Sequence, residues 1–298
     1  MAAETRDWTP CYRCCWCRSE FVQRMVDGVK AWVCPTDACY ERQIKFKILD
    51  VNGKLFYLPM PRLVELEEAV ESQNYGAICL GGDRSGGKSV GIRALIYRYC
   101  MKIENFAGLF LRREFPQLEL NHMRFVPTEA KRLGGSYSDK TLKFPETNAV
   151  LKFGHCHAPK DYASYIGGDL DLIAFGQLEQ FTQQQFTEIS PSTGRIRRDN
   201  WRGLVLAEEN PGGPLSSFVK EFFIEKNPDP KAFPDYDPTD HHFIASQLDD
   251  NPYTDPRYVK KLANLIHERR QMFRFGRRDI FPGQYFQRFN AAKHVTPQ

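Results

Sequence analysis

Gly82-Asp83-Arg84-Ser85-Gly86-Gly87-Lys88-Ser89 is the stretch that predicts the fold of this 298-residue chain. It fits the pattern G-x-x-x-x-G-K-S/T, the phosphate-binding loop or P-loop, which requires a strand before it and a helix after it. The apolar run Ala77–Leu80 predicts that strand, and the pattern from Ser89 to about Lys102 predicts the helix. Because motif and context agree, a chance glycine-rich turn is the weaker interpretation.

The residue types in this loop suit a nucleoside triphosphate, with ATP as the first expectation. Glycines let backbone N–H groups turn toward phosphates, and the helix N-terminus adds a favourable dipole. Lys88 is expected to contact the β- and γ-phosphates, and the Ser89 hydroxyl to bind Mg²⁺. We therefore expect nucleotide contacts from all eight loop residues: Gly82, Asp83, Arg84, Ser85, Gly86, Gly87, Lys88 and Ser89.

Further apolar runs alternate with helical patterns after the loop. Such alternation is typical of a mostly parallel sheet with helices on both faces. Two runs around a Pro-Asn turn predict a β-hairpin. The expected fold is therefore an α/β P-loop NTPase, a three-layer sandwich. Its expected strands after the loop are Ala107–Leu111, Leu170–Phe175 and Leu204–Ala207, and the hairpin is Thr141–Phe144 with Val150–Phe153.

Composition sets broad limits on the function. The formal charge of +4, from 41 basic and 37 acidic residues, permits a nucleic-acid partner but does not by itself indicate one. We find no apolar run of about 18 residues and no signal-peptide core at the N-terminus. We therefore expect no membrane partner and a reducing cytoplasm.

The cysteines are concentrated near the N-terminus, where six of the nine fall between Cys11 and Cys39. The spacing Cys14-x₂-Cys17, sixteen residues, then Cys34-x₄-Cys39 predicts a Cys₄ zinc ribbon with these four residues as ligands. Cys11 and Cys15 leave the ligand set open, and free thiols are the alternative. Of the remaining cysteines, we expect Cys79 and Cys100 to be core residues. Cys156 lies between His155 and His157; we expect a loop there, and metal binding by these three residues is the alternative.

These patterns divide the chain into three expected parts. Residues 1–45 form the zinc-ribbon module, residues 46–226 the P-loop core, and residues 227–298 a lid or linker extension. The extension includes a basic, exposed helix predicted over Asp255–Phe273.

With the P-loop assigned, the rest of the chain resembles the large terminase subunit of tailed bacteriophages, over roughly residues 75–295. The resemblance lies in the shared order of several short pieces rather than in any single one. They are Leu109-Phe110-Leu111-Arg112-Arg113, the hairpin Leu142-Lys143-Phe144-Pro145 to Leu151-Lys152-Phe153-Gly154, Tyr165-Ile166-Gly167-Gly168, Phe181-Thr182, Asn210-Pro211-Gly212-Gly213-Pro214, Leu248-Asp249-Asp250-Asn251-Pro252-Tyr253 and Gly283-Gln284-Tyr285-Phe286.

The resemblance implies a motor ATPase that packages viral DNA. Its implied partners are duplex DNA, the portal protein and the small terminase subunit, and it implies a homo-oligomeric ring on the capsid in the host cell cytoplasm. Family members usually continue into a nuclease domain with an acidic metal site. The 298 residues stop about where that domain would begin, so we expect either a shortened form of a longer protein or a motor without a nuclease, and no DNA cleavage is predicted.

One position departs from the family pattern. The strand Leu170–Phe175 should be followed by Asp-Glu, the Walker B pair, in which the Asp holds Mg²⁺ and the Glu polarises the attacking water. Here Gly176 and Gln177 stand there, and a neutral amide cannot accept a proton as a carboxylate does. Three interpretations remain: a deliberate substitution that traps bound ATP, a nearby carboxylate in its place, or binding with little turnover. For the second, Glu179 is the first candidate and Asp171 the next, although Glu179 can also be a solvated residue.

A motor ATPase also needs a cation at the γ-phosphate and basic contacts to DNA. We expect Arg84 to act within the subunit; alternatives across a subunit interface are Arg112, Arg113, Arg195, Arg197 and Arg198. The basic groups available to DNA are Lys131, Arg132, Arg195–Arg198, Arg269, Arg270, Arg274, Arg277 and Arg278, although such runs are more often solvated faces.

The sequence thus predicts a DNA-packaging ATPase with Lys88, Arg84, Gln177 and Glu179 as its catalytic candidates. The alternatives are a nucleotide-binding assembly or regulatory protein without turnover, and another nucleic-acid motor such as a helicase.

Overall fold

The computed structural model describes residues 12–158, 160–195 and 198–278. Within them an eight-stranded sheet runs in the order β12-β5-β11-β10-β6-β9-β8-β7. The strands from β12 to β9 pair in parallel, whereas β7 and β8 pair antiparallel. Their bounds are β5 Ala77–Gly82, β6 Ala107–Arg112, β7 Ser136–Ser138, β8 Thr141–Phe144, β9 Ala149–His155, β10 Leu172–Gly176, β11 Leu204–Glu209 and β12 His241–Ser246.

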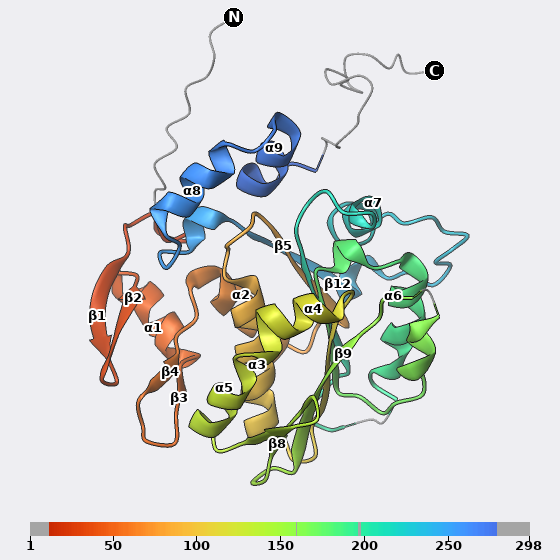
Figure 1. Cartoon of the computed structure of the whole chain (residues 1–298), viewed down its shortest axis with the longest axis horizontal. Coiled ribbons are helices and arrows are strands. Elements are labelled where there is room, and N and C mark those ends of the chain that lie inside the picture. Colours follow the sequence, from red (N-terminus) through yellow and green to blue (C-terminus); the bar gives the residue numbers. More distant parts are fainter. Residues whose placement is uncertain (1–11, 159, 196–197, 279–298) are drawn as a thin grey trace, which may run out of the picture.

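Helices cover both faces of this sheet, as Figure 1 shows. Alternate residues of one strand reach opposite cores: Ile78 and Leu80 of β5 join one cluster, and Cys79 joins the other. This alternation explains why β5, β10 and β11 are buried along their whole length. One face carries α2 Pro61–Glu71, α3 Lys88–Lys102, α4 Phe115–Leu118 and α5 Val126–Arg132; the other carries α6 Gln183–Ile189 and α7 Ser216–Val219. The predicted mixed α/β fold with a large, mostly parallel sheet is confirmed.

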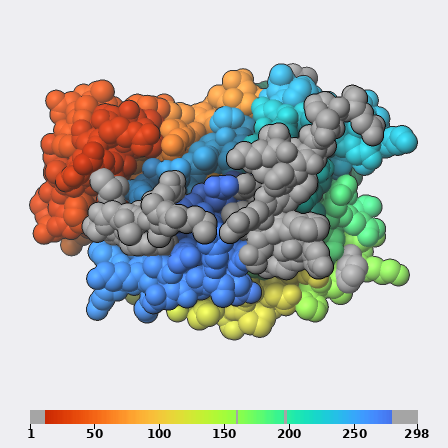
Figure 2. Space-filling model, turned by 90° about the horizontal axis from the view of Figure 1, so that it is seen from above, coloured from red at the N-terminus to blue at the C-terminus, as the bar shows by residue number. Residues whose placement is uncertain are grey.

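A small N-terminal module lies at one side of the molecule (Figures 1 and 2). It contains the antiparallel pair β1 Val22–Val26 and β2 Val29–Val33, then helix α1 Asp37–Lys45 and the hairpin β3 Ile48–Leu49 with β4 Leu55–Tyr57. Ion pairs from Arg42 to Glu68 and from Lys45 to Glu71 join α1 to α2. The module is therefore packed against the P-loop core.

The segment after residue 226 contributes a strand to the main sheet. We had expected a lid or linker there, outside the sheet. Strand β12 pairs with the P-loop strand β5 from His241↔Ala77 to Ser246↔Gly82. The single helix expected over Asp255–Phe273 is wrong: two helices, α8 Pro256–Ala263 and α9 His267–Phe275, cover that range. Figure 2 shows them on one face of the molecule, beside the N-terminal module. Among the described residues, no helix combines the length and the apolar character that a membrane crossing requires.

Candidate functional site

The loop between β5 and α3 has the backbone shape that its glycines allow. Gly87 caps α3 with a φ of 77°, in the left-handed region that favours glycine. Gly82 and Gly86 lie so close to β12 that a Cβ on either would be 2.2 Å from an oxygen of Ser246. The glycines at these positions therefore allow β12 to support the loop from behind.

Lys88 begins α3 and is almost fully buried. Its ammonium donates to the backbone carbonyls of Gly82 (3.3 Å) and Asp83, so it lies within the curve of the loop. Burial lowers the pKa of Lys88, and the neighbouring Glu208 and Glu209 act in the opposite direction. The cation is thus held among carbonyls and carboxylates, in the position where a phosphate would be neutralised.

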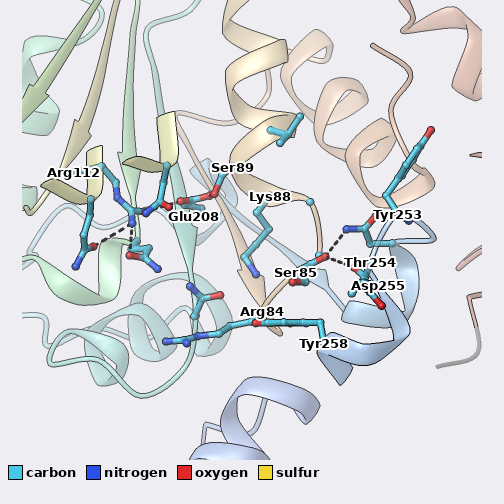
Figure 3. A pocket seen from close by; sticks show the side chains of 18 of the residues that line it. Arg84, Ser85, Lys88, Ser89, Arg112, Glu208, Tyr253, Thr254, Asp255 and Tyr258 are labelled. Carbon is cyan, nitrogen blue, oxygen red and sulfur yellow. Dashed lines mark hydrogen bonds and ion pairs between the residues drawn. The ribbon is translucent and has the colours of Figure 1, made fainter. Parts of the chain in front are cut away.

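A cavity of about 720 Å³ opens over this loop (Figure 3). Loop residues from Arg84 to Ser89 form one wall, and Arg112 and Gln177 form part of another. Most of the other lining groups are neutral, including several amides. The carboxylates that line it are Glu208 and Asp255, and Asp255 is paired with Arg257. The cavity thus offers a mainly polar, hydrogen-bonding surface with three basic and two acidic side chains, and the P-loop wall, which carries Arg84 and Lys88, suits a polyanion.

Glu208, at the end of β11, is a site residue that our sequence prediction missed. The Ser89 hydroxyl donates to its Oε2 (2.7 Å), and Arg112 Nη1 donates to its Oε1 (3.0 Å). Arg112 Nη2 donates to the side-chain oxygen of Gln177. A signal was present, since the apolar run Leu204–Ala207 ends directly in two glutamates.

The two carboxylates proposed as substitutes for the Walker B pair do not line this cavity. Asp171 precedes β10, at the opposite end of the strand from the P-loop, and pairs with Arg198 (2.6 Å). As a substitute base, Asp171 is therefore wrong. Glu179 is fully buried rather than solvated, and it accepts a hydrogen bond from the backbone N–H of Asn210 (3.1 Å). Burial first, and Glu209 second, raise the pKa of Glu179 to about 8.

The candidate arginines have different surroundings. Arg84 lines the cavity and its guanidinium stacks on Phe273, 3.6 Å from the ring centroid. Arg112 is buried in its own subunit's site, so the alternative in which it reaches across an interface is wrong. Arg113 donates to the backbone oxygen of Gln180, and Arg195 pairs with Asp169. Arg197 lies outside the described residues.

Several of the basic groups expected to contact DNA are engaged elsewhere. Arg132 pairs with Asp50, Arg274 with Asp249, and Arg278 with Glu209. Arg274 is also buried. Lys131, Arg269 and Arg277 are exposed. The predicted set is therefore not one continuous basic track, and α9 directs Arg274 toward Asp83 of the P-loop instead.

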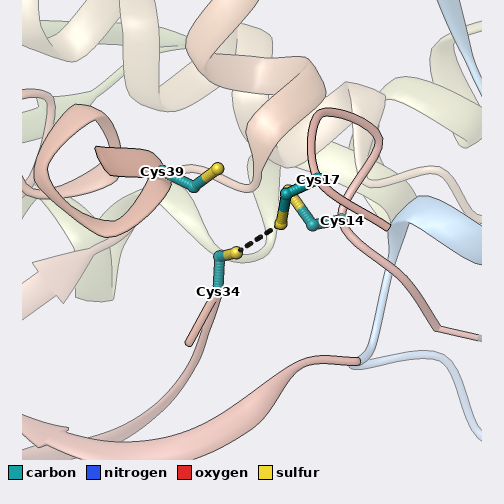
Figure 4. Close-up of side chains that lie close together, drawn as sticks. All are labelled: Cys14, Cys17, Cys34 and Cys39. Atoms are coloured by element: carbon teal, nitrogen blue, oxygen red, sulfur yellow. Dashed lines mark hydrogen bonds between the residues drawn. The ribbon is translucent and has the colours of Figure 1, made fainter. Parts of the chain in front are cut away.

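The structure brings together the four cysteines that the spacing selected (Figure 4). The sulfurs of Cys14, Cys17, Cys34 and Cys39 all lie within 4.8 Å of one another. Cys15 points instead toward Glu65, and Cys11 lies outside the described residues. The expected zinc ribbon is not confirmed, because Cys39 lies on helix α1 after a β-hairpin. Cys79 and Cys100 are core residues as expected, and Cys156 is also buried.

The module that carries these cysteines is connected to the P-loop by the segment 251–254. Tyr12 donates to the backbone oxygen of Thr254 (2.6 Å), and the Trp32 N–H donates to the Tyr253 hydroxyl (3.2 Å). From the same segment, the Asn251 amide donates to the backbone oxygen of Ser85 (2.6 Å). The segment 251–254 therefore bridges the cysteine module and the phosphate loop by hydrogen bonds to both.

A second, more apolar cavity of about 340 Å³ adjoins the first. The two cavities share Gly87, Val90, Asn251 and Tyr253. Its other walls include Leu58, Met60 and Leu63 from the core side and Val29, Lys30 and Ala31 from β2 of the module. A ligand that extends from the P-loop along α3 would enter it.

Comparisons with known proteins agree with this architecture. The family model described as phage terminase large subunit matches residues 130–278, half of the chain. No curated protein matches the chain in sequence. Among solved structures, the large terminase of a thermophilic bacteriophage superposes with a TM-score of 0.57 at 14% identity, covering 74% of this chain and 53% of that one.

Two further structures are similar. The large terminase of bacteriophage HK97 gives a TM-score of 0.52 at 15% identity, covering 80% of this chain and 55% of that one. The ATPase domain of a Thermus phage large terminase gives 0.50 at 12% identity, covering 82% and 98%. The chain therefore spans about half the length of the first two structures and nearly all of the isolated ATPase domain. At these identities the likeness establishes the fold.

Proposed function

The chain belongs to the phage terminase large subunit family, and we propose that it is the ATPase motor of a DNA-packaging terminase. In this proposal ATP binding and hydrolysis at the P-loop drive the movement of duplex DNA. The observation that carries the proposal is the position of Lys88 and Ser89, at the start of α3 and on the wall of a polar cavity.

ATP is the proposed nucleotide. The large terminase of the thermophilic bacteriophage has also been solved in complex with ADP and with ATP-γ-S. In this chain the larger cavity takes the phosphates, and the adjoining apolar cavity takes the base. An apolar slot beside a few polar groups is the usual setting for a nucleobase. Val90 and Tyr253, which line both cavities, lie where the sugar would connect the two.

Different residues of the chain would bind the phosphates, support the metal ion and orient the attacking water. Backbone N–H groups of the loop and the start of α3 hold the phosphates, and Lys88 neutralises them. The Ser89 hydroxyl donates a hydrogen bond to Glu208, so the lone pairs of the Ser89 oxygen stay available for Mg²⁺. Mg²⁺, when bound, lowers the repulsion between the β- and γ-phosphates. Arg84 reaches the γ-phosphate from the loop, and Gln177 orients water by hydrogen bonding rather than by accepting its proton.

The four-cysteine cluster would hold Zn²⁺. Zn–S bonds of about 2.3 Å in a tetrahedron separate the sulfurs by about 3.8 Å. Separations of at most 4.8 Å, with Cys17 and Cys34 at 3.3 Å, fit such a site after small adjustments. The module has a small core of its own, so the metal would contribute much of its folding free energy.

The remaining parts of the proposal follow from the family. Duplex DNA is the substrate of the motor, the portal protein and small terminase subunit are its partners, and a homo-oligomeric ring in the host cell cytoplasm is its working form. A second candidate function is nucleotide binding for assembly or regulation without turnover. It is favoured by one observation, the absence of a carboxylate at Gly176 and Gln177.

Equilibrium binding of Mg-ATP tests the nucleotide site. We expect Lys88→Ala to abolish measurable binding, because the cation inside the loop is lost. Lys220→Ala, which removes a lysine paired with Glu225 away from the loop, is the matched control and should bind normally. Equal affinity in the Lys88 and Lys220 variants would refute the assignment.

A further inference from the structure

Three adjacent strands bring Arg112, Gly176 and Glu208 into one row at the carboxyl edge of the sheet. Strand β10 lies between β6 and β11. Gly176 of β10 pairs with Arg112 of β6, and Phe175 pairs with Ala207 of β11. Glu208 is the next residue on β11, so it flanks Gly176 on the side opposite Arg112.

The side chain of Arg112 passes over Gly176 and ends at Glu208. A Cβ on Gly176 would lie 2.5 Å from Arg112 Cδ and 3.1 Å from the Phe110 ring. The space of a side chain at position 176 is thus occupied by Arg112, whose guanidinium ends on Glu208 and Gln177. A carboxylate at position 176 would require the side chain of this buried arginine to shift.

Glu208 presents its other oxygen to the P-loop. Its Oε2 accepts the Ser89 hydroxyl at 2.7 Å. β11 also pairs directly with the P-loop strand β5, with Glu208 opposite Leu80. A carboxylate on β11 therefore reaches Ser89 from the neighbouring strand, whereas one on β10 would reach it from a strand further away.

We propose that Glu208 supplies the Mg²⁺-site carboxylate in place of the missing acid at position 176. This inference rests on the proposed nucleotide site and names its metal-binding partner for Ser89. Arg112 is a positioning residue, which holds Glu208 in line with Ser89 and balances its charge when no metal is bound. The exchange explains the departure from the family pattern: the acid stands on β11, and Gly176 leaves room for the arginine that orients it.

Glu179 is the rival carboxylate, and its position does not suit this role. It is buried behind the cavity wall, where it accepts from the Asn210 N–H, and its Cγ would be 2.4 Å from a Cβ on Gly213. No contact joins it to Ser89. It supports the backbone of the segment Asn210–Pro214 instead.

The test compares ADP affinity with and without Mg²⁺ in the unchanged chain, Glu208→Gln and Glu179→Gln. Glutamine keeps the shape of the side chain and removes its charge. We expect Mg²⁺ to tighten ADP binding in the unchanged chain and in Glu179→Gln. In Glu208→Gln that enhancement should fall by about 10–100-fold, as is typical when a group that supports a metal ligand is lost. Glu208→Asp, which keeps the charge on a shorter side chain, should recover part of it.

Metal-free ADP binding separates the possible failures. It should be similar in all four proteins, which also shows that each variant is folded. If the unchanged chain binds no ADP, the proposed nucleotide site itself fails. If ADP binds but Glu208→Gln keeps the full Mg²⁺ enhancement, or Glu179→Gln loses it, the assignment of Glu208 is overturned while the nucleotide site stands. Direct detection of Mn²⁺ bound with ADP by electron paramagnetic resonance should follow the same order.

Discussion

Residue spacing was sufficient to predict two groups of side chains. Arg84 to Ser89 of the P-loop line the larger cavity, whereas Gly82 and Asp83 do not, and the four cysteines chosen by spacing converge. Both motifs are local, so that sequence distance approximates distance in space. Glu208 could not be selected in the same way. Two glutamates at the end of an apolar run are a local signal, but that signal gains its meaning only from the pairing of β11 with β5, which is a matter of strand order.

The pKa of Glu179 gives the site a pH dependence of stability. Burial, followed by the nearby Glu209, raises that pKa from the ordinary 4.5 to about 8. Between these values the folded state keeps a proton that the unfolded state releases, so the free energy of unfolding falls as pH rises through this window. The slope from this group is at most about 1.4 kcal/mol per pH unit.

Glu179→Gln should remove this contribution, because the amide does not titrate. The difference in free energy of unfolding, variant minus unchanged chain, should therefore be more favourable to the variant at pH 8 than at pH 5. Urea unfolding at a series of pH values measures the difference. Parallel stability curves for the two proteins would show that Glu179 is not a strongly perturbed carboxyl group.

Among the elements, the strands buried on both faces were the most predictable. β5, β6, β10 and β11 are apolar runs bounded by turn residues, and each prediction agrees with the structure to within two residues at either end. The region after residue 226 was less predictable. β12 has the sequence HHFIAS, which lacks a long apolar run, and it joins the sheet through pairing with β5. The landmark Gly283-Gln284-Tyr285-Phe286 lies outside the described residues.

The N-terminal module leads to a prediction about metal removal. Its strand β2 lines the cavity proposed for the base, and its contacts reach the P-loop through Tyr253 and Thr254. Cys39→Ser should therefore lower the zinc content and the melting temperature. It should also weaken ATP binding more than binding of inorganic triphosphate, which has no base.

Cys15→Ser is the matched control, since Cys15 lies in the same knuckle but outside the cluster. It should keep both zinc and ATP affinity. We would measure the zinc content by elemental analysis, the melting temperature by thermal unfolding, and the affinities for ATP and triphosphate by equilibrium binding. An unchanged melting temperature in Cys39→Ser would contradict the stabilising role of the metal. Equal losses of affinity for ATP and triphosphate would contradict the contribution of the module to the base site.

At the scale of the whole molecule, the proposed movement of DNA requires basic groups that can contact phosphates. The exposed basic groups, such as Lys131 and Arg269, are available for contacts to phosphates, whereas Arg274 and Arg278 are committed to carboxylates beside the P-loop. Sequence alone could not separate these two sets, because the distinction depends on how α9 packs. Contacts to phosphates weaken as salt displaces them, so any effect of DNA on the motor should depend on ionic strength.

Steady-state ATP hydrolysis with and without duplex DNA tests the central claim most directly. The account predicts hydrolysis that duplex DNA stimulates, that rising salt diminishes, and that Lys88→Ala eliminates while Lys220→Ala retains it. ATP binding without hydrolysis, whether or not DNA is present, would contradict the motor proposal and favour a nucleotide-binding assembly or regulatory protein.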